Sequence, residues 1–119
     1  DPTRGGVATI LNEIARQIKH GIALDEVPIP IKDQVQSACE MLGIDPLYVA
    51  NEGIFIAFVK ASVADATLNK LQAILPEGQK AALIGSVVTE HPGQVLMRTV
   101  IGGQRVVSMP SGEQLPRIC

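Results

Sequence analysis

The spacing of apolar residues changes period several times along this chain, and this pattern restricts the fold more than any other feature. Three segments have the three- to four-residue spacing of an amphipathic helix: about 6–19, 33–42 and 62–75. Three other segments are typical of strands: 22–27, 54–59 and 82–89. The segment 54–59 is uninterruptedly apolar, which favours a central strand covered on both faces.

The carboxy-terminal part reads as a hairpin. Two alternating segments, 94–100 and 104–109, flank Gly102 and Gly103, a pair suited to a two-residue turn. Helices and strands alternate first and the hairpin follows them. We therefore predict an α/β (α+β) sandwich: a mixed β-sheet with helices packed on it, a C-terminal hairpin and a flexible C-terminal tail.

Composition narrows the class of protein. The 119 residues suffice for one domain, and 46% hydrophobic content with only one Tyr, two Phe and no Trp predicts an aliphatic core. A net charge of −2 gives no reason to expect nucleic acid or a membrane surface as a partner. No apolar run approaches the roughly 18 residues that span a bilayer. We read the two cysteines as free thiols, which predicts a cytoplasmic protein.

The chain ends on a cysteine. Pro116 stiffens the approach to Cys119, and the ten residues 110–119 could span roughly 33 Å when extended. Such a tail could carry a nucleophilic sulfur into another protein or into a cleft of its own. The alternative is a frayed, solvated end without a role.

The first six residues contain a candidate phosphate site. A turn with Gly5 and Gly6 before a helix exposes backbone N–H groups, while Thr3 could add a hydroxyl and Arg4 a guanidinium. The alternative is an ordinary helix cap, in which Asp1 or Thr3 satisfies the first N–H groups.

A second candidate lies at Glu52, between Asn51 and Gly53. A carboxylate at the entrance to a strand could accept a proton from a bound group, although Glu is also common on exposed loops. The ring of Tyr48 is expected to pack rather than react, and Cys39 to be a core residue.

No metal site is predicted. His20 and His91 are far apart in the sequence and lack the spacing of metal ligands, and no cysteine cluster accompanies either of them.

Three motifs together carry a family resemblance: residues 1–6, residues 45–53 and the terminal run 116–119. The set closely resembles the C-terminal part of the HypE family of hydrogenase maturation factors, the carbamoyl dehydratases, over essentially the whole chain. The first motif is shared more loosely with selenophosphate and aminoimidazole ribonucleotide synthetases. The resemblance implies that 1–109 is the C-terminal α/β domain of an ATP-dependent synthetase-like protein, whose N-terminal ATP-binding domain would precede it. Residues 110–119 would be a flexible tail ending in the reactive cysteine.

The resemblance also implies a reaction. The carbamoyltransferase HypF would place a carbamoyl group on Cys119, and ATP with Mg²⁺, bound mostly by the preceding domain, would drive its dehydration to a thiocyanate. The cyano group would pass to an iron held by the HypC–HypD complex. The full-length protein would be a homodimer, whereas this piece alone is expected to be inactive and at most weakly associated.

The same resemblance assigns roles to single residues. Glu52 would be the acid/base residue, and Pro116, Arg117 and Ile118 would guide the tail. A contribution to the ATP site would come from the opening motif: Asp1, Thr3, Arg4, Gly5 and Gly6. The family commonly has Lys where this chain has Ile54, so a contact made by that Lys would be lost or replaced here.

Two other functions stay open. The tail could be a docking peptide for maturation partners, with all catalysis elsewhere. The chain could also belong to a synthetase that acts on a free small molecule, although such an enzyme does not need a terminal cysteine.

Overall fold

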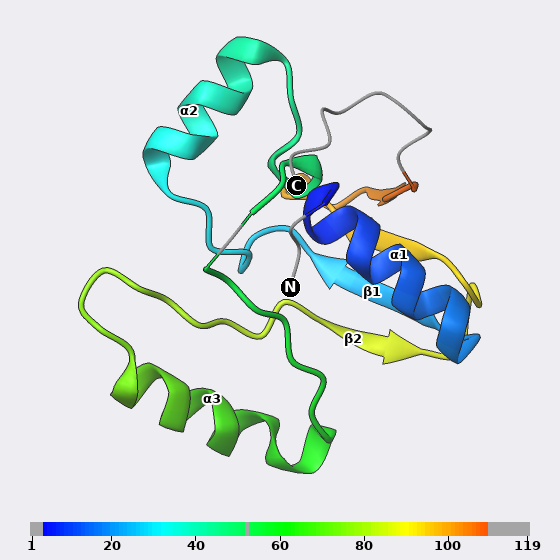
Figure 1. Cartoon of the computed structure of the whole chain (residues 1–119). Helices are drawn as coiled ribbons and strands as arrows, with labels where there is room; N and C mark the ends of the chain where they lie inside the picture. Colours follow the sequence, from blue (N-terminus) through cyan, green and yellow to red (C-terminus); the bar gives the residue numbers. More distant parts are fainter. Residues whose placement is uncertain (1–3, 52, 110–119) are drawn as a thin grey trace.

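The protein is built around one mixed four-stranded sheet (Figure 1). The computed structural model describes residues 4–51 and 53–109. In the sheet order β2-β1-β3-β4, β1 and β3 are parallel and the two outer pairs are antiparallel. The strands are β1 (Gly21–Asp25), β2 (Gly85–Val88), β3 (Val95–Arg98) and β4 (Gln104–Val106). The mixed sheet with helices confirms the predicted fold class.

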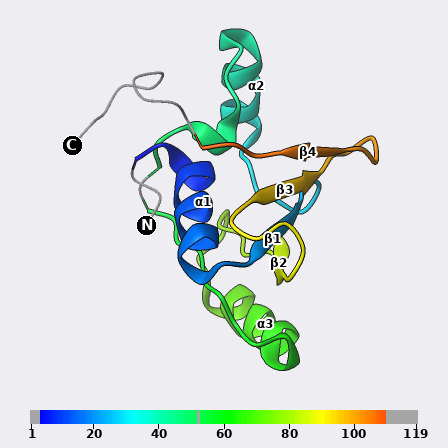
Figure 2. The same cartoon turned by 90° about the vertical axis from the view of Figure 1, so that its right-hand side faces the viewer.

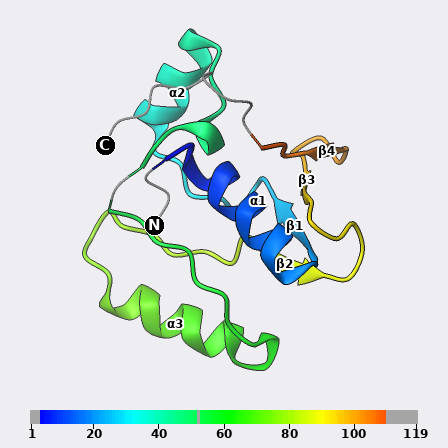
Figure 3. The same ribbon diagram turned by 45° about the vertical axis from the view of Figure 1, so that its right-hand side comes forward.

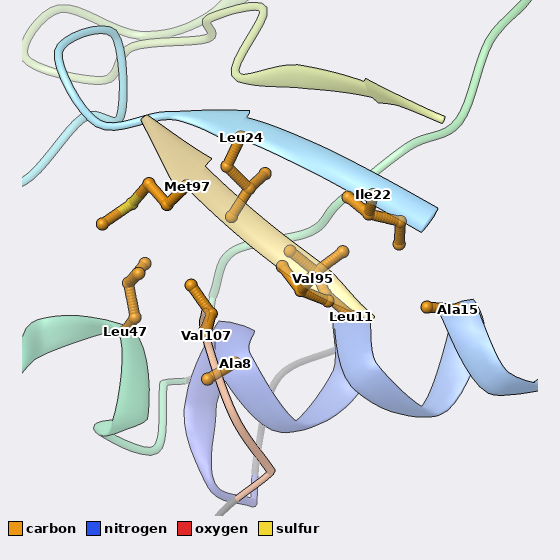
Figure 4. Close-up of a cluster of buried hydrophobic side chains, with 9 residues drawn as sticks. All are labelled: Ala8, Leu11, Ala15, Ile22, Leu24, Leu47, Val95, Met97 and Val107. Carbon is orange, nitrogen blue, oxygen red and sulfur yellow. The ribbon is translucent and has the colours of Figure 1, made fainter. Parts of the chain in front are cut away.

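Helix α1 (Gly6–Ile18) lies against one face of the sheet (Figure 2). Ile22 is opposite Val95 and Leu24 is opposite Met97 in the parallel pair, so their side chains share the face that α1 covers. Figure 4 shows these side chains around Leu11 of α1. The core is aliphatic, as the composition predicts.

The other two helices lie outside this core. Helix α2 (Asp33–Leu42) buries only Cys39, and α3 (Ala64–Ile74) buries no residue. In Figures 1 and 3, α3 stands apart from the sheet, and it contacts only the short 3₁₀ turn η2 (Ala61–Val63) among the helices and strands. The predicted helices are therefore confirmed, but the amphipathic spacing of 33–42 and 62–75 does not lead to burial here: Val35, Leu42 and Ile74 are all exposed.

The prediction of a central strand at 54–59 is also wrong. The segment has no assigned strand structure, and Phe55 and Phe58 are exposed. The central strands β1 and β3 already have neighbours on both sides, and 54–59 pairs with neither edge of the sheet. A continuous apolar run indicates a tendency to be covered, but it does not specify a strand partner.

The hairpin of β3 and β4 is confirmed, but its turn differs from the prediction. Arg98 pairs with Gln104, so the connection comprises residues 99–103 instead of a two-residue turn. The Thr99 N–H donates to the Gly103 carbonyl (2.7 Å), and the Gly102 N–H donates to the Thr99 carbonyl (2.9 Å). Residues 99 and 100 belong to this loop instead of the first strand, and the predicted strands 94–100 and 104–109 shorten to β3 and β4.

Among the residues that the structure describes, none of the helices combines the length and the apolar character that crossing a membrane requires.

Candidate functional site

The glycine turn before α1 is left-handed and closely packed. Gly5 and Gly6 have φ of 64° and 67°, a region that favours glycine. Gly6 is buried, and a Cβ on it would come within 2.5 Å of the backbone oxygens of Leu47 and Val49. Gly6 is therefore required by the close approach of two backbone segments, whether or not a ligand binds here.

The segment beneath the glycine turn is the 3₁₀ turn η1 (Pro46–Tyr48), which Asp45 organises. One carboxylate oxygen of Asp45 accepts a hydrogen bond from the Leu47 N–H (2.9 Å), and Pro46 follows at the first position of the turn. The other oxygen pairs with the Arg105 guanidinium at 2.6 Å. This turn is thereby joined to β4.

Asn12 joins α1 to the chain that leaves β4. Its side-chain amide donates to the Ala8 carbonyl and to the Val107 carbonyl, both at 2.8 Å. The Val107 N–H donates in turn to the Val95 carbonyl at 2.8 Å. Val107 is therefore held from the α1 side and from the sheet.

Tyr48 forms a hydrogen bond to Ser108, the residue after Val107. Its hydroxyl donates to the Ser108 carbonyl at 2.8 Å, and its ring is half-buried against the core. The same short turn therefore contacts Gly6 at the start of α1 and Ser108, one residue before the last described residue, Met109.

Three segments that are far apart in the sequence thus meet at one place, here called the junction: residues 4–6, 45–49 and 105–108. Figure 4 shows Leu47 and Val107 from two of these segments beside Ala8 in the first turns of α1. Chemically, the junction combines left-handed glycines at a helix start with a partly exposed ion pair and an anchored exit for the C-terminal residues.

The structure places only some of the predicted site residues. Gly5 and Gly6 lie in the junction, as does Arg4, which is exposed. Seven predicted residues lie outside the described residues: Asp1, Thr3, Glu52, Pro116, Arg117, Ile118 and Cys119.

The residues on either side of Glu52 lie in the described part of the chain. Asn51 and Gly53 are both exposed, and they come shortly after the turn at 45–49. The roles assigned to the seven residues stay predictions.

Two smaller expectations are confirmed. Tyr48 packs against the core, and Cys39 is a buried free thiol.

Within the described ranges 4–51 and 53–109, no three His, Cys, Asp or Glu side chains gather as a metal site would require.

Sequence reasoning missed Asn12, Asp45 and Arg105. Asn12 carries a signal, because it is a polar residue on the helix face that Ala8 and Ala15 also occupy. Asp45 followed by Pro46 is a recognisable start of a helical turn. Arg105 carries none, since its partner lies 60 positions away.

The sequence matches a known domain family. The model of the family "AIR synthase related protein, C-terminal domain" matches residues 1–98. The chain belongs to this family. The AIR synthase-related domain is also 55% identical over its full length to the carbamoyl dehydratase HypE of Cupriavidus necator, and 50% identical to that of Rhodobacter capsulatus. It spans about a third of these relatives, 34% and 35% of their lengths.

Solved structures agree with this assignment. A crystal structure of the hydrogenase maturation protein HypE matches the whole domain with a TM-score of 0.90 and 47% identity, over 39% of that chain. A HypE structure in complex with ATP matches the whole domain with a TM-score of 0.89 and 46% identity, over 36% of that chain. A HypE–HypF complex matches 92% of the domain with a TM-score of 0.84 and 39% identity, over 35% of that chain. The resemblance to the HypE family is confirmed.

Proposed function

We propose that this chain is the C-terminal part of a nickel–iron hydrogenase maturation protein that dehydrates a carbamoyl group carried on Cys119. The observation that carries the proposal is the 50–55% identity to carbamoyl dehydratases HypE across all 119 residues. Because the domain spans only about a third of those relatives, the proposal includes an N-terminal ATP-binding domain in a longer protein. Residues 1–109 would form the C-terminal domain and 110–119 the tail.

The reaction requires a leaving group on carbon. The carbamoyl thioester on Cys119 has an amide oxygen that leaves poorly, so transfer of the terminal phosphoryl group of ATP to this oxygen prepares it for departure. Glu52 acts as the base for the amide protons. Loss of two N–H protons and of phosphate, with cleavage of the carbon–oxygen bond, leaves a thiocyanate on the sulfur. Transfer of the cyano group as cyanide would break the carbon–sulfur bond, taking two electrons from an electron donor in the iron-carrying acceptor complex and returning the sulfur of Cys119 to a thiolate.

The junction supports this proposal by its position. Gly6 and Ser108 both contact the turn at 45–49. In this proposal the tail continues from there, and the glycine turn contributes to the nucleotide site together with Asp1, Thr3 and Arg4. Ten residues follow Met109 and could extend roughly 33 Å. The domain measures 39 × 36 × 33 Å, so the sulfur could reach either a cleft of its own protein or a partner.

The comparisons support the cofactor and one partner. A HypE structure contains ATP and another contains HypF. By extension we assign ATP with Mg²⁺ as the cosubstrate and HypF as the carbamoyl donor. The HypC–HypD complex would be the acceptor, the longer protein a homodimer, and its location the cytoplasm. The isolated domain is expected to hydrolyse no ATP.

A second candidate function is a docking module whose tail only binds maturation partners. The existence of a HypE–HypF complex favours it as much as it favours the enzyme. The two differ in one respect, because only the enzyme changes the mass of Cys119.

Mass spectrometry of the intact longer protein separates these functions. With HypF, carbamoyl phosphate and ATP, we expect a gain of about 43 Da on Cys119 and then a fall of about 18 Da, since a carbamoyl group replaces the thiol hydrogen and then loses water. Cys119→Ala should abolish both changes. The matched control is Cys39→Ala, which removes the other thiol and should leave both changes in place. An unmodified Cys119 under conditions that modify a known HypE would favour the docking module.

The role of Glu52 needs a separate experiment. Glu52→Gln should slow the 18 Da loss without slowing the 43 Da gain, because it removes the base and keeps the thiol. An unchanged dehydration rate would remove Glu52 from the mechanism.

A further inference from the structure

We propose that Asn12 and Tyr48 are positioning residues that fix where and in which direction the chain leaves the sheet toward Cys119. The inference rests on the proposed function, in which the sulfur of Cys119 must be presented to a nucleotide site. Neither residue is assigned contact with the reacting atoms.

The first observation is a pair of consecutive anchored carbonyls. The Val107 carbonyl accepts from Asn12 and the Ser108 carbonyl accepts from Tyr48, each at 2.8 Å. These are the last two carbonyls before Met109, where the described chain ends. Asn12 of α1 and Tyr48 of η1 therefore bind two consecutive backbone carbonyls at this point of the chain.

The second observation is the surroundings of Asn12. Its side chain is 4% exposed, and among the described residues it is the only polar one that is buried. A buried amide in a helix interior carries a desolvation penalty, which its two hydrogen bonds offset. Within the described ranges, the side chain of Asn12 makes one hydrogen bond outside its own helix, and that bond goes to Val107.

The third observation is that one turn serves two segments. Residues 45–49 place two backbone oxygens against Gly6, and Tyr48 in the same turn binds Ser108. The Asp45–Arg105 pair adds a further bond between the turn and β4. Ser108 is thereby linked to the glycine turn through one shared segment, residues 45–49.

A fixed exit matters because tail length does not limit reach. A tail of ten residues can extend roughly 33 Å, so the local concentration of the sulfur at a site depends on where the tether starts and points. Release of residues 107–109 would lengthen the tether from 10 to 13 residues, which lowers effective concentration by only about 1.5-fold. Loss of a defined direction lowers the effective concentration of the sulfur further, and we expect a total decrease of about two- to fivefold.

The test compares the same chemistry with and without the tether in the longer protein. In the tethered assay, Cys119 is carbamoylated and its dehydration rate is followed by intact mass. In the untethered assay, Cys119→Ala protein receives a synthetic peptide of residues 110–119 that carries S-carbamoyl cysteine. Tyr48→Phe removes one hydroxyl and keeps the ring that packs against the core. Gln72→Ala is the matched control, because it also removes one side-chain bond to a backbone carbonyl, that of Ala81 in a distant part of the domain.

We expect the double variant Tyr48→Phe/Asn12→Leu to slow the tethered reaction about two- to fivefold relative to Gln72→Ala, and to leave kcat/KM for the peptide unchanged. Tyr48→Phe alone should slow the tethered reaction less than the double variant, because Val107 keeps its bonds to Asn12 and Val95. Unfolding is measured alongside, because Asn12→Leu leaves the Val107 carbonyl without this donor. Equal slowing of tethered and untethered reactions would overturn the proposal, as would a tethered rate equal to that of Gln72→Ala. If the unaltered protein turns over no peptide, the tethered comparison with Gln72→Ala decides alone. Absence of dehydration in unaltered protein would instead overturn the proposed function, and this inference with it.

Discussion

Two apolar regions of this chain differ in how far their side chains are buried. In β3, Val95 and Met97 are 0% and 1% exposed, because α1 covers the face of the sheet on which they lie. In the region 54–75, Phe55 is 67% exposed and Ile74 is 76% exposed, although the apolar pattern of this region is as strong. An apolar pattern therefore indicates that a segment could be buried. Whether its side chains are buried depends on the element that packs against it.

The difference also bears on the proposed longer protein. The ten residues 54–63 include five exposed large apolar side chains: Ile54, Phe55, Phe58, Val59 and Val63. Large exposed apolar patches mark surfaces that meet another molecule or segment. At the junction, the one buried polar side chain of the described residues, Asn12, has its amide hydrogen-bonded to two carbonyls.

The largest expected effect is a loss of stability from the buried region alone. Leu11→Ala should lower the free energy of unfolding by about 2–5 kcal/mol, because Leu11 is fully buried between α1 and the sheet. Phe55→Ala, the matched truncation in the exposed region, should change it by about 0.5 kcal/mol or less. Urea denaturation of this chain measures both. A cost for Phe55→Ala close to that of Leu11→Ala would show that the two regions are equally packed.

The next effect isolates the close approach at the junction. Gly6 and Gly43 have the same φ of 67°, but only Gly6 has backbone atoms where a Cβ would stand. Gly43→Ala should cost about 1–2 kcal/mol of left-handed strain, while Gly6→Ala should cost about 1–3 kcal/mol more through overlap. Thermal or urea unfolding of both variants provides the comparison, and equal costs would contradict the packing described for the junction.

These contrasts show what the sequence could predict. Helix α2 has the predicted bounds because Gly43 ends it and apolar spacing defines it, and both signals are local. The missing strand at 54–59 and the five-residue loop at 99–103 depend on pairing, which no local pattern specifies. At the site, the glycine turn was predictable from two adjacent glycines. The bond from Asn12 to Val107 was not, because it joins residues 95 positions apart.

The smallest expected effect separates two ion pairs. The side chains of Asp45 and its partner Arg105 are 29% and 37% exposed, whereas those of Asp25 and Arg98 are 45% and 67% exposed. Asp45→Ala should cost about 1–2 kcal/mol, because it also removes the hydrogen bond to the Leu47 N–H. Asp25→Ala should cost about 0–1 kcal/mol. Repeating the unfolding at high salt should reduce the Asp25 effect more completely, and identical salt responses would mean that the cap contributes nothing.

The anchoring of residues 107 and 108 is tested most directly by paramagnetic relaxation enhancement, measured by NMR in this 119-residue chain. A nitroxide is attached to Cys119 in a Cys39→Ala background, and amide line broadening is read across the domain. A flexible tether of ten residues has a mean span of roughly 18 Å, so we expect strong broadening at residues 4–6 and 45–49 and little along α3. Broadening of α3 that equals or exceeds broadening of the junction would contradict it.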